Sequence, residues 1–242
     1  MNNPIIVALD VPKMETALRL AEQLAPVVGA FKVGKELFVS AGPEVVRRIR
    51  DMGASVFLDL KFHDIPNTVA GAVTAAVHLD VQMLTIHASG GREMMRAAEL
   101  AAQETAQALG RTPPLVLGVT VLTSLDSNEL SEIGMSPNVG HQVERLAELA
   151  AKAGLRGLVC SALEIAALRQ IIPEDMKLVT PGIRPEGSEK DDQKRTLSPK
   201  EAIDAGADWL VMGRPICGAE NPRTAAEQIL ASLKQTASPH FD

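Results

Sequence analysis

The chain has 242 residues, of which 46% are hydrophobic, and a formal net charge of −6 at pH 7. This length and composition are sufficient for one large domain with a substantial core. The acidic balance argues against broad nucleic-acid binding, which requires a basic stripe, but it leaves room for a locally basic pocket that binds a small anion.

Two features of the sequence predict a cytoplasmic location. The first residues contain no basic region followed by a long apolar run, and no stretch is long and apolar enough to cross a membrane. The two cysteines, Cys160 and Cys217, are far apart and form no Cys-x-x-Cys pattern. We therefore expect neither a disulfide nor a zinc site, and two inert thiols in a reducing compartment.

Apolar runs alternate with segments of helical periodicity along the whole chain. The runs cover residues 4–9, 30–33, 54–58, 81–86, 114–121, 157–159, 177–180 and 207–212. Helical segments follow them, with a helical region through Ile49, helices over about 66–79 and 139–153, and a final helix, after Ile216, through Leu233. A short acidic turn is expected before the helix at 139. Residues 181–195 form the one long polar loop, and the polar tail 235–242 is expected to fray.

This alternation predicts an α/β fold, a (β/α)8 TIM barrel in a single domain over residues 1–242. The 242 residues divide into units of about 30 residues, as this barrel requires. An open doubly wound sheet is the competing fold, but it usually carries a Gly-x-Gly-x-x-Gly turn after its first strand. Asp10-Val-Pro-Lys occupies that position here. In the barrel, the C-terminal ends of the strands build the active site.

Ionisable and hydroxyl side chains concentrate after the third apolar run. The motif reads Asp59-Leu-Lys61-Phe-His63-Asp64-Ile65-Pro66-Asn67-Thr68. Residues two apart in a strand point to the same side, so Asp59 and Lys61 share a face. Pro66 suits the first turn of a helix. Charges buried together require pairing, and the spacing alone is equally consistent with a structural ion-pair cluster and with a functional site.

The last strand supplies a second signal, independent of the first. Gly213 and Arg214 follow it directly. The loops after strands seven and eight of such barrels commonly bind phosphate through backbone N–H groups, and arginine adds a charge-assisted pair of donors. A surface arginine beyond a strand end is the structural alternative, but its position in the fold favours a phosphate site.

Several motifs together resemble those of the orotidine 5'-phosphate decarboxylase family. The resemblance covers residues 4–233 and shows no departure at a catalytic position. The motifs are Ala-Leu-Asp10, Lys32 in the second strand, Asp59-x-Lys61-x-x-Asp64-Ile65-Pro66-x-Thr68, Pro181-Gly-Ile-Arg184-Pro185, and Met-Gly213-Arg214-Pro. The resemblance implies a cofactor-free and metal-free barrel enzyme that converts orotidine 5'-phosphate to uridine 5'-phosphate (UMP) and CO2, the last step of pyrimidine nucleotide synthesis.

The resemblance also implies catalytic roles for four charged residues. Lys61 is expected to protonate C6 of the pyrimidine as CO2 leaves, with Asp59 beside the departing carboxylate. Lys32 is expected to bond within the charged array. Asp64 is expected to reach into the active site of a partner subunit, as is Thr68, which implies a homodimer with shared sites.

The remaining expected contacts bind the other parts of the substrate. Asp10 and Thr68 hold the ribose hydroxyls, Ile65 packs near the base, and Thr123, with Ser124, reads the pyrimidine edge. Thr120 is an alternative to Thr123, and the sequence does not decide between them. Gln193, Arg214 and the N–H of Gly213 are expected to bind the phosphate. Pro181 and Arg184 are expected to help form and anchor the loop that closes over the site.

Three other functions compete with this one. A metal-dependent sugar-phosphate lyase shares the Asp-x-Lys-x-x-Asp pattern but needs a carboxylate on strand two, where this chain has Lys32. A phosphosugar isomerase needs a glutamate base after a late strand, and Pro181-Gly-Ile-Arg184 contains none. A catalytically inactive phosphate-binding protein has no need of two lysines alternating with aspartates.

Overall fold

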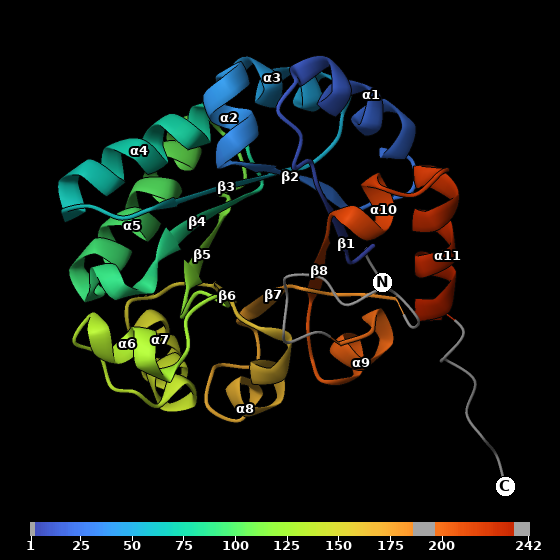
Figure 1. Ribbon diagram of the computed structural model, residues 1–242. Coiled ribbons are helices and arrows are strands. Elements are labelled where there is room, and N and C mark those ends of the chain that lie inside the picture. Colours follow the sequence, from blue (N-terminus) through green and yellow to red (C-terminus); the bar gives the residue numbers. More distant parts are fainter. Residues whose placement is uncertain (1–2, 186–196, 235–242) are drawn as a thin grey trace, which may run out of the picture.

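Eight parallel strands close into a barrel in the computed structural model, which describes residues 3–185 and 197–234 (Figure 1). Each strand pairs with its successor, and the last pairs with the first. The strands are β1 (Ile5–Ala8), β2 (Ala30–Gly34), β3 (Val56–Phe62), β4 (Met83–His87), β5 (Leu115–Val119), β6 (Gly157–Val159), β7 (Lys177–Pro181) and β8 (Trp209–Met212). All eight apolar runs are therefore strands, and the predicted (β/α)8 barrel is confirmed.

Helices surround the barrel and cover its outer face (Figure 1). They are α1 (Met14–Leu24), α2 (Lys35–Ala41), α3 (Glu44–Asp51), α4 (Pro66–His78), α5 (Arg92–Ala108), α6 (Ser127–Glu132), α7 (Val139–Lys152), α8 (Ile165–Arg169), α9 (Pro199–Asp204), α10 (Arg214–Cys217) and α11 (Pro222–Lys234), with short 3-10 turns η1 (Ala88–Gly90) and η2 (Ala162–Glu164). Within the described ranges, none of these helices is long and apolar enough to span a membrane.

The helix predictions need three corrections. The helical region after β2 is two helices, α2 and α3, because Gly42 adopts a positive φ of 67° and Pro43 follows it. The acidic turn before α7 contains α6, whose N-terminus is capped reciprocally by Asp126 and Glu129. Residues 213–216, expected to connect the last strand to the final helix, contribute to the short helix α10, which precedes α11. The expected tail 235–242 lies outside the described residues.

The core has two layers, separated by the wall of the barrel. Side chains that point outward pack against the helices and form the larger cluster. The barrel interior is filled by a second, smaller cluster: Ile6, Ala8, Ala30, Phe57, Met83, Leu117, Val179 and Val211. Because strand side chains alternate, the next inward-pointing residue toward the C-terminal end of each strand lies directly above this apolar floor.

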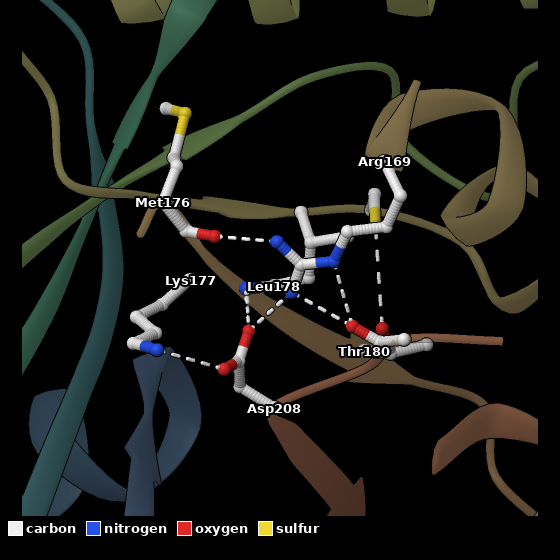
Figure 2. A network of polar contacts seen from close by, with 8 residues as sticks. Arg169, Met176, Lys177, Leu178, Thr180 and Asp208 are labelled. Carbon is white, nitrogen blue, oxygen red and sulfur yellow. Dashed lines mark hydrogen bonds and ion pairs between the residues drawn. The ribbon is translucent and has the colours of Figure 1, made fainter. Parts of the chain in front are cut away.

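A polar network lies at the opposite, N-terminal end of the barrel, where β7 and β8 begin (Figure 2). Asp208 accepts hydrogen bonds from Arg169, from Lys177 at 3.0 Å and from the backbone N–H of Leu178 at 2.8 Å. Arg169 also donates to the carbonyl oxygen of Gly206. In this fold the N-terminal face contributes stability and not chemistry, so we assign a structural role to this network.

Candidate active site

The strand register brings three of the predicted charged residues to the same place. Ala8 pairs with Lys32, and Gly34 pairs with Asp59. Ala8 points into the barrel, so Lys32, its partner on the neighbouring strand, does so as well. Asp59 also points inward, because it lies two residues after the inward-pointing Phe57 on β3. Asp10 follows β1 at the same end.

These residues form a chain of alternating charges. The Lys61 Nζ lies 2.7 Å from Asp59 Oδ1, and Lys32 Nζ lies 3.8 Å from Asp59 Oδ2. Lys32 Nζ also donates to Asp10 Oδ1 at 2.9 Å. The side chains of Lys32 and Asp59 are only 12% and 13% exposed, so water screens their charges weakly.

The surroundings of Asp59 keep its carboxyl ionised. Burial alone raises the pKa of Asp59, but the charges of Lys61 and Lys32 and hydrogen bonds from Lys61 and Thr85 outweigh it, so that the pKa lies below its usual value. The Asp59 carboxyl is therefore negatively charged at neutral pH, between the side chains of Lys32 and Lys61.

A cavity of about 680 Å³ opens above the array. This volume is within the range of pockets that hold small-molecule ligands. Its lining includes ten residues that the sequence analysis had singled out: Asp10, Lys32, Asp59, Lys61, Thr123, Ser124, Pro181, Arg184, Gly213 and Arg214. Val119, Val159 and Val211 line it as well and give it apolar surface beside the charged group. One cavity thus combines a charged centre, an apolar wall and an arginine at each of two strand ends.

Three predicted site residues lie elsewhere. Asp64, Ile65 and Thr68 are exposed and do not line this cavity, and Ile65 leaves 66% of its surface exposed. The Asp64 carboxylate accepts a hydrogen bond from the backbone N–H of Ile65 at 2.6 Å. Helix α4 begins at Pro66, as the motif predicts. Gln193 lies outside the described residues.

The structure distinguishes between the two threonines near the end of β5. Thr120 is buried, and its hydroxyl donates to the carbonyl oxygen of Val159 at 3.3 Å. Thr123 is exposed and lines the cavity. Of the two, only Thr123 lines the cavity.

The two ends of the loop after β7 are held together. Ile183 and Leu197 form an isolated parallel bridge, and the N–H of Arg184 donates to the carbonyl oxygen of Leu197 at 3.0 Å. Arg184 therefore has a fixed backbone at the rim of the cavity.

Sequence reasoning missed one polar residue of the site, Thr85 on β4. Its side chain is fully buried, and its hydroxyl lies 3.0 Å from Asp59 Oδ1. It also accepts a hydrogen bond of 2.9 Å from the backbone N–H of Lys61. The available signal was a lone hydroxyl within the apolar run of β4.

His87 and the two cysteines are poor candidates for acid-base or nucleophilic roles. Burial lowers the pKa of His87 to about 4, and the charges of His63, Lys61 and Lys35 act in the same direction. The rings of His63 and His87 are 5.5 Å apart. Burial raises the pKa of the Cys160 and Cys217 thiols to about 12 and about 11, so both free thiols are protonated at neutral pH.

Comparisons with known proteins identify the family of this chain. Residues 3–229 match the family model described as "Orotidine 5'-phosphate decarboxylase / HUMPS family". The orotidine 5'-phosphate decarboxylase of Pseudomonas fluorescens (strain SBW25) is 53% identical over 230 residues, which cover 95% of this chain and 97% of the relative. That of Moorella thermoacetica is 50% identical over 231 residues, covering 95% and 92%.

Solved structures show the same fold. The orotidine 5'-phosphate decarboxylase from Lactobacillus acidophilus superposes with a TM-score of 0.86 at 37% identity, covering 96% of this chain and 99% of that one. An uncharacterized conserved protein from Geobacillus kaustophilus superposes with a TM-score of 0.84 at 33% identity, covering 96% and 100%. The matched family model and the high identity over nearly the full length of both chains show that this chain belongs to the orotidine 5'-phosphate decarboxylase / HUMPS family.

Proposed function

We propose that this chain decarboxylates orotidine 5'-phosphate to UMP and CO2 without a metal or cofactor. The observation that carries the proposal is the alternating array of Asp10, Lys32, Asp59 and Lys61 at the floor of the cavity. The named relatives support the same substrate.

The reaction requires a fixed cation at the reacting carbon. When the bond between C6 and the carboxylate carbon breaks, both electrons stay on C6 in an orbital that the ring cannot delocalise. The Lys61 ammonium stabilises this developing charge and then gives C6 a proton, as its own N–H bond breaks. The Asp59 carboxylate, 2.7 Å from Lys61 Nζ, holds the ammonium in place.

Asp59 has a second effect in this mechanism. The substrate carboxylate is negatively charged and would lie beside Asp59, whereas the product CO2 is neutral, so the like-charge contact disappears during the reaction. Lys32 bonds to Asp10 and approaches Asp59 from the other side. A divalent cation bound to Asp59 would need a second carboxylate beside it, and the Lys32 ammonium lies at that position instead. This supports a metal-free reaction.

The rest of the substrate has complementary groups around the cavity. Arg214 and the N–H of Gly213 would bind the phosphate, with Arg184 and Pro181 at the rim and Gln193 as a further expected contact. Asp10 would hold a ribose hydroxyl, and Thr123 with Ser124 would read the pyrimidine edge. Binding energy from the distant phosphate would then support the chemistry at C6.

We also propose a homodimer whose two active sites are shared. Asp64, Ile65 and Thr68 belong to the same motif as Asp59 and Lys61, yet they are exposed and lie outside the cavity of their own subunit. This arrangement fits side chains that complete the site of a partner, where Thr68 would reach the ribose and Ile65 the base. A cytoplasmic location remains our prediction, supported by two free thiols.

The first test follows the absorbance of orotidine 5'-phosphate after addition of the purified protein, with and without EDTA. We expect conversion to UMP at the same rate in both samples. No conversion would contradict the decarboxylase assignment. Conversion that EDTA abolishes would contradict the metal-free mechanism and redirect attention to Mg²⁺-dependent sugar-phosphate substrates.

Shared sites can be tested by mixing two inactive variants, Lys61→Ala and Asp64→Ala. If Asp64 acts in the partner's site, each mixed dimer contains one site with both defects and one intact site. Random exchange of subunits would then restore about a quarter of wild-type activity. If Asp64 acts within its own subunit, no mixed dimer has an intact site and the mixture stays inactive.

A further inference from the structure

Thr85 has an unusual position for a hydroxyl. It lies on β4, two residues beyond Met83, whose side chain belongs to the apolar cluster inside the barrel. Thr85 therefore also points inward, and its exposed fraction is 0%. A buried hydroxyl needs hydrogen-bond partners, and its partners here are two residues of the charged array.

The direction of both hydrogen bonds follows from chemistry. A backbone N–H can only donate, so Thr85 Oγ1 accepts from Lys61 N–H at 2.9 Å. An ionised carboxylate can only accept, so the hydroxyl donates its single proton to Asp59 Oδ1 at 3.0 Å. One hydroxyl thus connects the backbone of Lys61 to the carboxylate that binds the Lys61 ammonium.

The backbone of Lys61 needs such support. Its φ of 53° lies in the left-handed region, which is unfavourable for a residue with a side chain. The pairing of β3 with β4 also shifts register between Leu58 and Phe62. At this irregularity the Thr85 hydroxyl accepts the Lys61 N–H in place of a partner from the regular ladder.

We propose that Thr85 is a positioning residue for the decarboxylation, holding the Lys61 backbone and the Asp59 carboxylate in one fixed arrangement. This inference rests on the proposed function. Thr85 does not line the cavity and would touch no substrate atom. It acts through Lys61 and Asp59, and the groups proposed to bind the phosphate are on other strand ends.

Loss of the hydroxyl should therefore affect turnover more than binding. Without it, the Lys61 N–H loses the acceptor that it has in this structure, and Asp59 Oδ1 loses one of its two side-chain donors, Thr85 and the Lys61 ammonium. The distance between the ammonium and C6 is then less well fixed, and misplacement of a reacting group reduces the rate of the chemical step. Substrate affinity from the phosphate and ribose contacts is unchanged.

The test compares Thr85→Val, Thr85→Ser and the control Thr180→Val. Valine has nearly the shape of threonine but no hydroxyl, whereas serine keeps the hydroxyl. Thr180, on β7, is equally buried and follows the inward-pointing Val179, so it faces away from the cavity. We expect Thr85→Val to lower kcat about 10- to 100-fold with KM within about twofold, and Thr85→Ser to recover most of kcat. Thr180→Val should leave kcat unchanged.

Two results would overturn the inference: a Thr85→Val enzyme with wild-type kcat, or a Thr85→Ser enzyme as slow as Thr85→Val. Should Thr85→Val fail to fold, amide hydrogen exchange at Lys61 in the wild type and in Thr85→Ser decides the matter. Protection in both supports the hydrogen bond, and rapid exchange in the wild type contradicts it. Absence of turnover in the wild type would instead refute the proposed function, which separates the two failures.

Discussion

The Lys61 ammonium lies 2.7 Å from the Asp59 carboxylate, although Lys61 has a left-handed backbone and a regular strand does not. The contact is therefore made despite an irregular backbone, at the point where β3 loses its regular pairing with β4. Strained backbone conformations concentrate at functional sites, where the surrounding structure holds them in place. The strain at Lys61 suggests that the position of its ammonium matters more than local stability.

Two substitutions of Lys61 separate these contributions. Both Lys61→Ala and Lys61→Gly should lower kcat by at least about 1,000-fold, because the cation and the proton donor are lost. Glycine tolerates positive φ, so Lys61→Gly should be more stable than Lys61→Ala by about 1 kcal/mol in urea unfolding.

A matched pair at Lys177 controls for the intrinsic flexibility of glycine. Lys177 is an exposed strand residue that is not among those with positive φ, so there the glycine variant should be the less stable one. Normal decarboxylation by Lys61→Ala would remove Lys61 from the mechanism. Equal stabilities of the two Lys61 variants would contradict the strain.

Arg214→Ala should chiefly weaken substrate binding. Loss of a charge-assisted contact to phosphate costs about 1.5–3 kcal/mol, which corresponds to a rise in KM of about 10- to 100-fold. Arg223→Ala is a suitable control, because Arg223 pairs with Glu227 on the surface of α11. Orotidine, which lacks the phosphate, provides a second control, since Arg214→Ala should hardly change its conversion. An unchanged KM for orotidine 5'-phosphate would exclude Arg214 from the phosphate site.

Much of the barrel could be predicted because its units repeat. Each apolar run ends in polar residues and is followed by helical periodicity, so the number and positions of the strands were readable. Two-residue alternation predicted that Asp59 and Lys61 share a face, and their side chains do pair, although the backbone at Lys61 is not that of a regular strand. Helix α6 was missed because it is short and buries only Leu130, although the capping pair Asp126 and Glu129 is present in the sequence.

Other parts of the site were beyond the reach of sequence reasoning for physical reasons. Thr85 and His87 alternate with Leu84 and Ile86, but β4 is buried on both faces, so this alternation does not show which face points into the barrel. The register shift that brings Thr85 to the Lys61 N–H leaves no local sequence signature. Asp64 and Thr68 do not line the cavity although they follow Asp59 and Lys61 in one motif, because spacing along the chain does not fix where side chains beyond a strand end point.

His87 should make stability depend on pH below neutrality. Its pKa is about 4 in the folded protein, against an ordinary value of 6.5. Between these values the unfolded chain binds more protons than the folded one, so the free energy of unfolding should fall as pH decreases from 6.5 to 4. His87→Gln should reduce this dependence of the free energy of unfolding on pH. Urea unfolding at about pH 7.5, 6 and 5 compares conditions above and within the range between the two pKa values. His78→Gln, at an exposed position on α4, should leave the pH dependence unchanged. The prediction is contradicted if the free energy of unfolding falls equally with pH in the wild type and in His87→Gln.

The network at the N-terminal end of the barrel should contribute stability without contributing to activity. Asp208 is the shared acceptor of Arg169, Lys177 and the Leu178 N–H (Figure 2). Asp208→Ala leaves a partly buried guanidinium without its carboxylate, and breaking such a pair costs about 3 kcal/mol.

Asp204→Ala provides the comparison, because the exposed pair of Asp204 with Lys200 should contribute less than about 0.5 kcal/mol. Urea unfolding measures both losses of stability. At about 25 °C both variants should remain folded, and their kcat should equal that of the wild type. The active site occupies the opposite ends of the same strands, so a fall in kcat in folded Asp208→Ala would show that the two ends of the barrel are coupled.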